Sequence, residues 1–323
     1  KNFKLNKTIH QFYPVDHFYF TNKFLNFWKP KVAIFIESEI WPCMFKNLEN
    51  KKIPLILLNA RLTEKTFNRW MKIKNFTKSI FGKIKISYPQ NLETKKYLKK
   101  INSTKINHIG NLKFIENKLP ENSKEKKKLK KQFKNRNIWV ATSTHLGEEE
   151  FCAKAHLELK KRVKNPLTII IPRHIHRVPQ IIKELKKLNL KIETHSSGWK
   201  NLKNVDIYIV DTFGETQKFH EISSSVFLGG SIIERGGQNP LEAARYGARI
   251  LHGPNIDNFK EIYKKLKSIK IAIKILTPQK LASSIIFKKN RNIGKKIKNI
   301  GTKIFKKIIK ELDNIIKNEF EKT

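Results

Sequence analysis

Short, continuously apolar runs alternate along this chain with longer amphipathic stretches. A parallel strand that is buried on both faces reads as a continuous apolar run, and the helices that connect such strands read as amphipathic stretches. The alternation therefore predicts an α/β chain built on parallel sheets. We expect strands at 31–37, 53–59, 84–88 and 106–110, and a second series at 138–141, 167–172, 205–210, 226–228 and 249–251.

Two separate series of strands predict two doubly wound, Rossmann-like domains, and 323 residues are enough for each to bury a core. The domains are expected at 1–118 and 137–290. Between them, 119–136 is rich in charge and poor in apolar periodicity, which is typical of a linker. At the C-terminus, 291–323 repeats isoleucine every three or four residues and predicts an amphipathic helix. We expect that helix to pack on the domains; the alternative is a basic helix on an anionic membrane surface.

The formal net charge of +41 allows two interpretations. Clustered lysines and arginines would attract a polyanion such as a nucleic acid or an anionic lipid surface. Here lysine is spread over nearly every segment beside abundant isoleucine and asparagine, which favours a general amino-acid bias. A nucleic-acid-binding protein therefore stays an alternative that depends on clustering of these charges.

The cysteines and the apolar runs argue against several classes of protein. Cys43 and Cys152 lie far apart, and neither has a His or Cys at metal-ligand spacing, so a disulfide framework and a zinc site are not expected. This pattern suits a reducing cytoplasm. No apolar run is long enough to span a bilayer. The chain begins with Lys1 rather than Met, and we expect it to be a fragment.

Several strand ends of the second domain carry residues suited to ligands, which in doubly wound domains bind beyond the carboxyl ends of the strands. Arg173 follows the apolar run that ends at Pro172, and its guanidinium could hold a phosphate through paired donors. The alternative is a solvated basic turn. Gly229 and Gly230 follow another run, where the missing side chains would let the backbone approach a ligand closely.

Two further strand ends lead into expected helices. Asn239 is expected to cap a helix that ends near Gly247. Free N–H groups at such a helix start favour an anion, and Glu242 could accept hydrogen bonds from ribose hydroxyls or simply stabilise the first turn. The segment 211–215 repeats the arrangement, with an aspartate as the expected cap.

In the first domain, Glu37 and Glu39 follow the first expected strand. Their spacing would place both carboxylates on one face if the strand continued, whereas a turn would separate them. Lys113 ends the last expected strand of that domain. As one lysine among many, it is expected on the surface.

Taken in order, eight segments of this chain resemble the 3-deoxy-manno-octulosonic acid (Kdo) transferases that act on the lipid A precursor, and they cover essentially the full chain. The segments are 37–42, 59–62, 110–114, 141–149, 172–174, 211–215, 229–231 and 239–242, with the sequences ESEIWP, NARL, GNLKF, ATSTHLGEE, PRH, DTFGE, GGS and NPLE. No single segment is decisive, but eight in this order are specific.

The resemblance implies a GT-B fold, with two Rossmann-like domains facing a cleft, and the inverting transfer of Kdo from CMP-Kdo to a lipid A precursor. It implies that Glu37 and Lys113 support the transition state. CMP would be bound by Pro172, Arg173, Phe213, Gly214, Glu215, Asn239, Pro240, Leu241 and Glu242, with further contacts from Ser143, Thr144, Gly230 and Ser231. No metal or cofactor is implied. The partners would be CMP-Kdo, the lipid A precursor and an anionic membrane surface, without nucleic acid.

The chain departs from the family's pattern at its general base, a glutamate in a Gly-Glu turn near the start of the N-terminal domain. No segment here matches that turn, so we expect the N-terminal domain to be incomplete. Ile175, His176 and Gln238 also replace the family's usual Pro, Glu and His. We expect the enzyme at the cytoplasmic face of the inner membrane, peripherally or through an anchor in the missing segment. The alternatives are another GT-B nucleotide-sugar transferase or epimerase, and a truncated chain that binds CMP without transferring Kdo.

Overall fold

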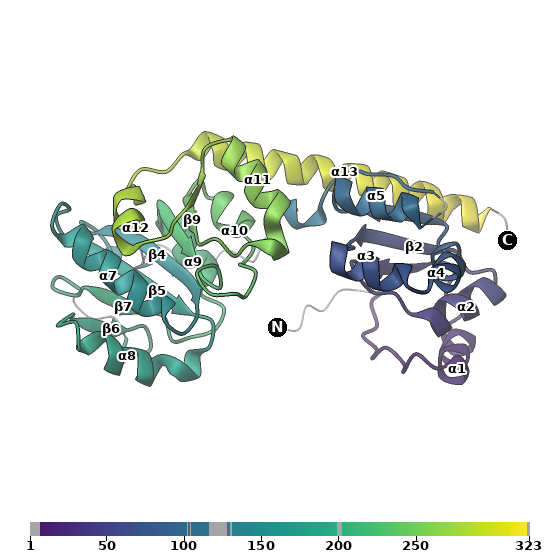
Figure 1. Ribbon diagram of the computed structural model, residues 1–323, viewed down its shortest axis with the longest axis horizontal. Coiled ribbons are helices and arrows are strands. Elements are labelled where there is room, and N and C mark those ends of the chain that lie inside the picture. Colours follow the sequence, from purple (N-terminus) through teal and green to yellow (C-terminus); the bar gives the residue numbers. More distant parts are fainter. Residues whose placement is uncertain are drawn as a thin grey trace. The chain divides into compact units, whose positions relative to one another are not determined.

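The computed structural model describes residues 7–101, 103, 105–115, 128–129, 131–198 and 202–321. The chain forms two compact units (Figure 1): unit 1 consists of Lys1–Leu112 and Thr302–Thr323, and unit 2 of Lys113–Gly301. The boundary after Leu112 differs from the predicted end of the first domain at 118. The C-terminal helix is divided between the units and does not form the separate segment predicted at 291–323. The linker predicted for 119–136 falls largely outside the described residues.

Within its described residues, unit 1 contains a parallel sheet in the order β1 (Ala33–Ile36), β2 (Leu55–Ala60) and β3 (Ile86–Pro89). Every residue of β2 and β3 is buried, which accounts for the continuous apolar run at the start of β2. The strand predicted at 106–110 is wrong, because only Ile106 forms a bridge, to Ser87. Beyond it, Gly110 adopts a φ of +131° and packs so closely on Ile304 that a Cβ would lie 2.8 Å from that side chain. Packing on the C-terminal helix replaces strand pairing there.

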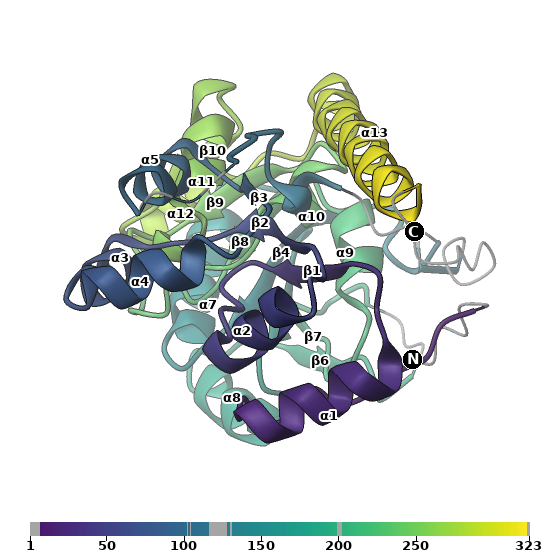
Figure 2. The same ribbon diagram turned by 90° about the vertical axis from the view of Figure 1, so that its right-hand side faces the viewer.

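Capping residues mark the starts of several helices in unit 1, which are α1 (Phe18–Trp28), α2 (Pro42–Asn50), α3 (Glu64–Met71), α4 (Lys74–Phe81) and α5 (Leu92–Lys100). Thr63 and Asn91 accept hydrogen bonds from the first turns of α3 and α5. At the start of α2, Asp16 accepts from the N–H groups of Cys43 and Met44 over 3.2 and 2.9 Å. Because Asp16 lies two residues before α1, this contact helps to hold α1 against α2 (Figure 2).

The described residues of unit 2 contain a parallel sheet in the order β10-β9-β8-β4-β5-β7-β6. Its strands are β4 (Asn137–Thr144), β5 (Pro166–Pro172), β6 (Ile192–Thr194), β7 (Ile207–Ile209), β8 (Ser225–Leu228), β9 (Arg249–His252) and β10 (Ala272–Lys274). The second series of predicted strands is confirmed. The prediction missed β6 and β10, because each is an edge strand of three residues and neither forms a buried apolar run.

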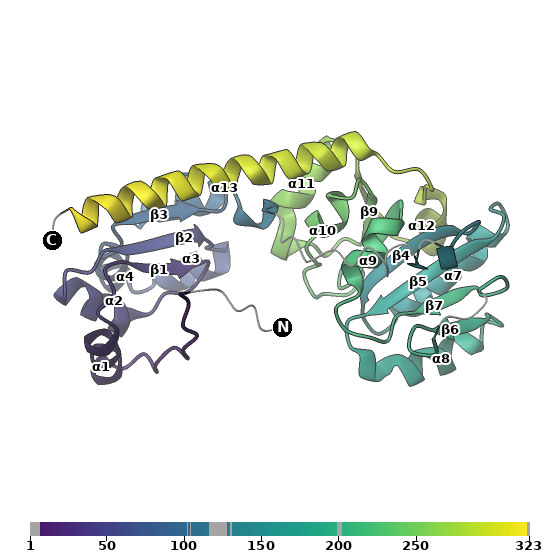
Figure 3. The ribbon, with the colours of Figure 1, turned by 180° about the vertical axis from the view of Figure 1, so that it is seen from behind.

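Helices cover both faces of the unit 2 sheet, as predicted (Figures 1 and 3). On one face lie α7 (Glu148–Lys160), α8 (Val178–Lys186) and α12 (Pro278–Ser284), which share a core with β4 through Trp139 and Ala141. On the other face lie α9 (Thr216–Ile222) and α10 (Leu241–Ala244), where Phe219 contacts Tyr208 of β7 with ring centroids 6.3 Å apart. Further elements among the described residues are α11 (Lys260–Ser268) and the 3-10 helices η1 (Leu112–Phe114), η2 (Ile175–Arg177) and η3 (Asp257–Phe259).

The long helix α13 (Arg291–Phe320) begins in unit 2 and ends in unit 1. Its predicted apolar stripe is packed inside the protein, since Ile297, Ile304 and Ile308 are buried. In unit 1, Glu311 of α13 accepts a hydrogen bond of 3.2 Å from the Tyr88 hydroxyl. The predicted packing of this helix is therefore confirmed for these residues.

Candidate functional site

The strand order of unit 2 contains a topological switch point between β4 and β8. The chain runs from β4 to β5 on one side and later returns to β8 on the other side of β4. The connections after these strands lead to helices on opposite faces, α7 after β4 and α10 after β8. In doubly wound sheets, ligands bind at the carboxyl ends of the strands next to such a point. The structure brings the predicted residues 143–144, 172–173 and 229–231 together at this edge.

Glu148 ties the ends of β4 and β8 together, a role that the sequence reasoning missed. Its side chain is fully buried at the start of α7. One carboxylate oxygen, Oε2, accepts from the N–H groups of His145 and Gly230 at 3.0 and 2.7 Å. The other, Oε1, accepts from those of Ser231 and Ile232 at 3.1 and 3.0 Å. These charge-assisted hydrogen bonds compensate for the burial of the carboxylate and fix the two strand ends relative to each other.

Close packing inside the protein explains why the first of the two adjacent glycines, Gly229 and Gly230, must be a glycine. A Cβ on Gly229 would lie 2.3 Å from the carbonyl oxygen of Ser143, so no larger residue fits between the two strand ends. Gly230 has a φ of +65°, and a Cβ there would lie 3.4 Å from His145 Nε2 and 3.5 Å from Gln238 Nε2. The nearest atom to such a Cβ would be Arg235 Cβ at 3.3 Å, so Gly230 is closely surrounded, with the polar side chains of His145 and Gln238 beside it.

The three hydroxyl-bearing residues predicted at this edge differ in how far their side chains are exposed to a ligand. Ser143 has a left-handed φ of +55° and a partly exposed side chain. Thr144 and Ser231 are fully buried. The Ser231 hydroxyl donates to the Leu228 carbonyl and accepts from the Gly253 N–H at 2.8 Å. Ser143 is therefore the accessible hydroxyl of the three.

The two arginines that follow β5 have different surroundings. Arg173 is exposed, and its backbone N–H donates to the Thr144 carbonyl at 3.0 Å. Pro172, just before it, is buried. Arg177 makes two hydrogen bonds, of 3.0 and 3.3 Å, to the carboxylate of Glu149, which is 1% exposed. Arg177 thus neutralises a buried carboxylate, whereas the guanidinium of Arg173 faces solvent and suits a phosphate.

A half-buried histidine stands beside Arg173. The rings of His145 and His174 lie 5.8 Å apart. The pKa of His145 is lowered, mainly because burial disfavours its charged form and also because His174 and two arginines lie near, although the Glu148 carboxylate raises it. At neutral pH the His145 imidazole is therefore an uncharged hydrogen-bonding group at this edge.

The segment 211–215 does not form the predicted capped helix start. Asp211 accepts from the N–H of Ser196 at 2.8 Å and from its hydroxyl, so it binds the chain after β6 and does not cap α9. Helix α9 begins one residue after this segment without a side-chain cap. Phe213 is 79% exposed, Gly214 has a φ of +84°, and Glu215 forms an ion pair of 2.9 Å with a lysine of α9.

The helix predicted to start at Asn239 is shorter than expected, because α10 contains only four residues. Asn239 still acts locally, since its Oδ1 accepts from the Leu241 N–H at 3.1 Å. Pro240 and Leu241 are buried, so neither side chain is exposed to a ligand. Burial raises the pKa of the partly exposed Glu242. Four residues add up to little helix dipole, so the anion preference predicted for this helix start is not supported.

In unit 1, Glu37 and Asn59 lie at the carboxyl ends of β1 and β2 in left-handed conformations, with φ values of +61° and +51°. Asn59 Nδ2 donates to Glu37 Oε1 over 3.4 Å. The Arg61 N–H donates to the backbone carbonyl of Glu37 at 3.1 Å, and the Ser38 hydroxyl donates to the carbonyl of Arg61 at 3.0 Å. These contacts join the two strand ends.

The turn after β1 separates the two predicted carboxylates. Glu39 accepts a hydrogen bond of 2.9 Å from Trp41 Nε1, whereas Glu37 contacts Asn59. Lys113 belongs to unit 2 and lies in the 3-10 helix η1, so its predicted position at a strand end is wrong. Its Nζ lies 5.2 Å from the centre of the Phe259 ring.

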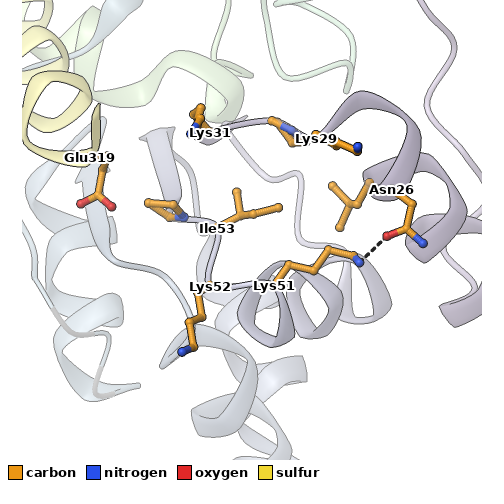
Figure 4. Close-up of a pocket in the computed structure, with 10 residues that line it drawn as sticks. Asn26, Lys29, Lys31, Lys51, Lys52, Ile53 and Glu319 are labelled. Atoms are coloured by element: carbon orange, nitrogen blue, oxygen red, sulfur yellow. Dashed lines mark hydrogen bonds between the residues drawn. The ribbon is translucent and has the colours of Figure 1, made fainter. Parts of the chain in front are cut away.

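A cavity of about 850 Å³ lies at the opposite edge of the unit 1 sheet, before β1 and β2 (Figure 4). Its charged lining residues are Lys29, Lys31, Lys51, Lys52 and Glu319. Lys29 and Lys51 follow the C-terminal ends of α1 and α2, where a cation offsets the negative end of the helix dipole. The cavity contains none of the predicted site residues.

Across the described ranges, no cluster of His, Cys, Asp and Glu side chains could hold a metal ion. In that same part of the chain, no helix combines the length and the apolar character that crossing a membrane requires.

Comparisons with known proteins support the family that the sequence segments at these strand ends suggested. A family model described as 3-deoxy-D-manno-octulosonic-acid transferase (kdotransferase) matches residues 1–116. The 3-deoxy-D-manno-octulosonic acid transferase of Rickettsia bellii (strain RML369-C) is 36% identical over 292 residues, which cover 90% of this chain and 69% of that protein. The chain belongs to the Kdo transferase family.

Other members of the Kdo transferase family are longer than this chain. The chain spans 60% of the transferase of Rickettsia felis, to which it is 37% identical over 285 residues, or 86% of its own length. Among solved structures, a glycosyltransferase from Rickettsia africae aligns with a TM-score of 0.55 at 13% identity, over 98% of this chain and 85% of that one. This likeness, together with the two parallel α/β units, confirms the predicted GT-B fold.

Proposed function

We propose that this chain transfers Kdo from CMP-Kdo to a lipid A precursor, with inversion at the anomeric carbon, in the synthesis of the lipopolysaccharide core. The observation that carries the proposal is membership of the Kdo transferase family. The grouping of Ser143, Arg173 and Gly230 at one strand edge of unit 2 supports it.

The CMP part of the donor would bind at the carboxyl edge of the unit 2 sheet. Arg173 offers an exposed guanidinium for the phosphate. Phe213, which is 79% exposed, offers a ring face on which a base can stack. Glu242 is partly exposed, and its carboxyl group could bind the ribose hydroxyls. His145, which lies beside Gly230, offers an uncharged imidazole as a hydrogen-bonding group for the sugar or the phosphate.

The transfer separates charge. The bond between the sugar and the phosphate breaks, CMP leaves with the electron pair, and the oxygen of an acceptor hydroxyl forms the new bond to the anomeric carbon. Positive charge develops on the sugar and negative charge on the phosphate. The Glu37 carboxylate would stabilise the sugar, while Arg173 and Lys113 would balance the departing CMP. The proton of the acceptor hydroxyl would pass to a general base.

Because the acceptor is a lipid, we place the enzyme at the cytoplasmic face of the inner membrane, bound either peripherally or through a membrane anchor. Unit 1 exposes aromatic side chains near its N-terminal end, including Phe12 at 83%, Tyr19 at 60% and Phe27 at 77%. Exposed aromatic rings beside many lysines suit the interface of an anionic membrane.

Transfer and donor binding test the proposal separately. Incubation with CMP-Kdo and a lipid A precursor in vesicles should increase the mass of the acceptor by one or more Kdo residues. In calorimetry, CMP and CMP-Kdo should bind more tightly than UDP-sugars. Tighter binding of UDP-sugars would favour another GT-B enzyme and reject the proposal.

Arg173→Ala should weaken CMP binding at least tenfold, because a charge-assisted hydrogen bond contributes about 1.5–3 kcal/mol. Lys183→Ala, which removes an exposed cation from the neighbouring helix α8, is the charge-matched control and should leave the affinity within twofold. Equal CMP affinities in the two variants would remove Arg173 from the donor site.

A further inference from the structure

Asn59 belongs to a segment that the resemblance singled out but to which no function is yet assigned. It is the last residue but one of β2, and only 3% of the residue is exposed. Both ends of its side-chain amide are used: Oδ1 accepts from the backbone N–H of Leu112 at 3.0 Å, and Nδ2 donates to Glu37 Oε1 at 3.4 Å. One buried amide thus contacts two segments far apart in the sequence.

The orientation of this amide follows from its surroundings. The Leu112 N–H can only donate, so the amide oxygen of Asn59 must face it. The amide nitrogen is then turned toward the Glu37 carboxylate, which can only accept when ionised. The amide therefore cannot flip without breaking both contacts and leaving buried polar atoms unpaired.

The backbone conformation by itself does not require asparagine. Asn59 has a φ of +51°, and glycine adopts that conformation at lower cost. A buried amide at such a position is unfavourable unless its hydrogen bonds are satisfied. The position therefore requires the side chain of Asn59 and not only its backbone conformation.

The two segments that Asn59 contacts carry the residues predicted to support the transition state. The backbone of Glu37 is already fixed by hydrogen bonds to Leu58 and Arg61, at 3.0 and 3.1 Å. Asn59 adds a contact to its carboxylate. Leu112 immediately precedes Lys113, so a hold on the Leu112 N–H fixes the start of the turn that carries Lys113.

We propose that Asn59 is a positioning residue, whose amide holds the Glu37 carboxylate and the Leu112 N–H in the arrangement that the transfer requires. The inference rests on the proposed function for its catalytic consequence. Its structural part, the hydrogen bond from the Leu112 N–H to Asn59, can be measured even if the chain shows no transferase activity.

Two variants separate the backbone role of Asn59 from the role of its side chain. Asn59→Gly keeps the left-handed conformation and removes both hydrogen bonds. Asn59→Asp keeps an acceptor for the Leu112 N–H but places a second carboxyl group against Glu37. Asn189→Gly is the matched control, because Asn189 is an exposed asparagine with a φ of +53° in unit 2.

Hydrogen exchange at the Leu112 amide, measured on the full chain, tests the structural part. We expect exchange about tenfold faster in Asn59→Gly, and within twofold of wild type in Asn59→Asp and Asn189→Gly. Unchanged exchange in Asn59→Gly would overturn the inference.

Kinetics tests the catalytic part. Asn59→Gly should lower kcat about tenfold with KM within twofold, since the contact acts on the reacting geometry. In Asn59→Asp, the acid limb of the pH profile of kcat should move about one unit to higher pH, because two adjacent carboxyl groups cannot both ionise easily. Unchanged kcat in Asn59→Gly, or an unchanged pH profile in Asn59→Asp, would overturn the positioning role.

If the wild-type chain transfers no Kdo, the proposed function fails by itself. The Leu112 exchange rates then decide the inference alone: faster exchange in Asn59→Gly supports the hold by Asn59, and equal rates reject it.

Discussion

Replacing Glu148 by glutamine should destabilise unit 2 strongly, although the side chain keeps its size. The buried carboxylate accepts four backbone N–H groups, two on each oxygen. In Glu148→Gln, one oxygen becomes an NH₂ group that cannot accept, so two of the four donors lose their partner. A hydrogen bond to a charged group contributes about 1.5–3 kcal/mol, so the loss should be about 3–6 kcal/mol. At roughly 2–4 °C per kcal/mol, the melting temperature should fall by about 6–24 °C.

Scanning calorimetry measures the melting temperature, and hydrogen exchange locates the effect in the loop after β8. The matched control is Glu150→Gln, which makes the same chemical change on the same helix. The Glu150 side chain is 50% exposed and forms a surface ion pair of 2.8 Å with Lys154. Its loss should change the stability by less than about 0.5 kcal/mol. Equal shifts in the two variants would refute the role of Glu148 as the acceptor that joins β4 to β8.

Three further changes test other contacts of unit 2. Gly229→Ala should cost about 1–3 kcal/mol, because the added Cβ would lie 2.3 Å from the Ser143 carbonyl oxygen; a wild-type urea midpoint would contradict this. Arg177→Ala leaves the buried carboxylate of Glu149 unpaired, so calorimetry should detect a loss of about 3–5 kcal/mol, and a loss below about 1 kcal/mol would speak against the pair. Burial lowers the pKa of His220 to about 3, whereas the unfolded chain titrates near 6.5, so stability should fall as the pH drops from about 6.5 toward 3. His220→Leu should flatten that part of the urea-unfolding profile, and parallel profiles for the variant and the wild type would argue against this assignment.

The strands could be predicted from the sequence where burial on both faces leaves a continuous apolar run. Every residue of β5 is buried, and its prediction differs from the observed bounds by one residue. The segment 106–110 looks similar in sequence but pairs only at Ile106, since packing of Gly110 on α13 directs the chain away from β3. A local pattern records that a segment is buried, but not whether a strand or a helix covers it.

The candidate site could be predicted as far as its residues follow strand ends. Arg173, Ser143 and Gly230 meet at one edge because parallel strands end together there. The partners of buried charges could not be predicted in the same way. Glu148 has the sequence pattern of an ordinary first-turn glutamate, yet three of its four donors lie more than 80 residues later in the chain. Asp211 reads as a cap for the following helix, yet it binds Ser196, which precedes it.

Backbone conformation marks the same strand ends without reference to any motif. Within the described residues, the non-glycine positions with positive φ other than Glu37 and Ser143 are all lysines and asparagines, such as Lys29 after α1, where a left-handed residue is ordinary. Glutamate and serine are less common in that conformation, which costs energy and persists only where the surroundings enforce it. At Glu37 the neighbouring strand end supplies Asn59, and at Ser143 it supplies the close packing of Gly229. The strand order indicates a ligand site at the edge that contains Ser143, and the resemblance to Kdo transferases indicates a functional role for Glu37. The strained backbone conformation indicates both residues independently. We infer that these two edges are held in place for binding and chemistry, because stability alone would favour relaxed turns there.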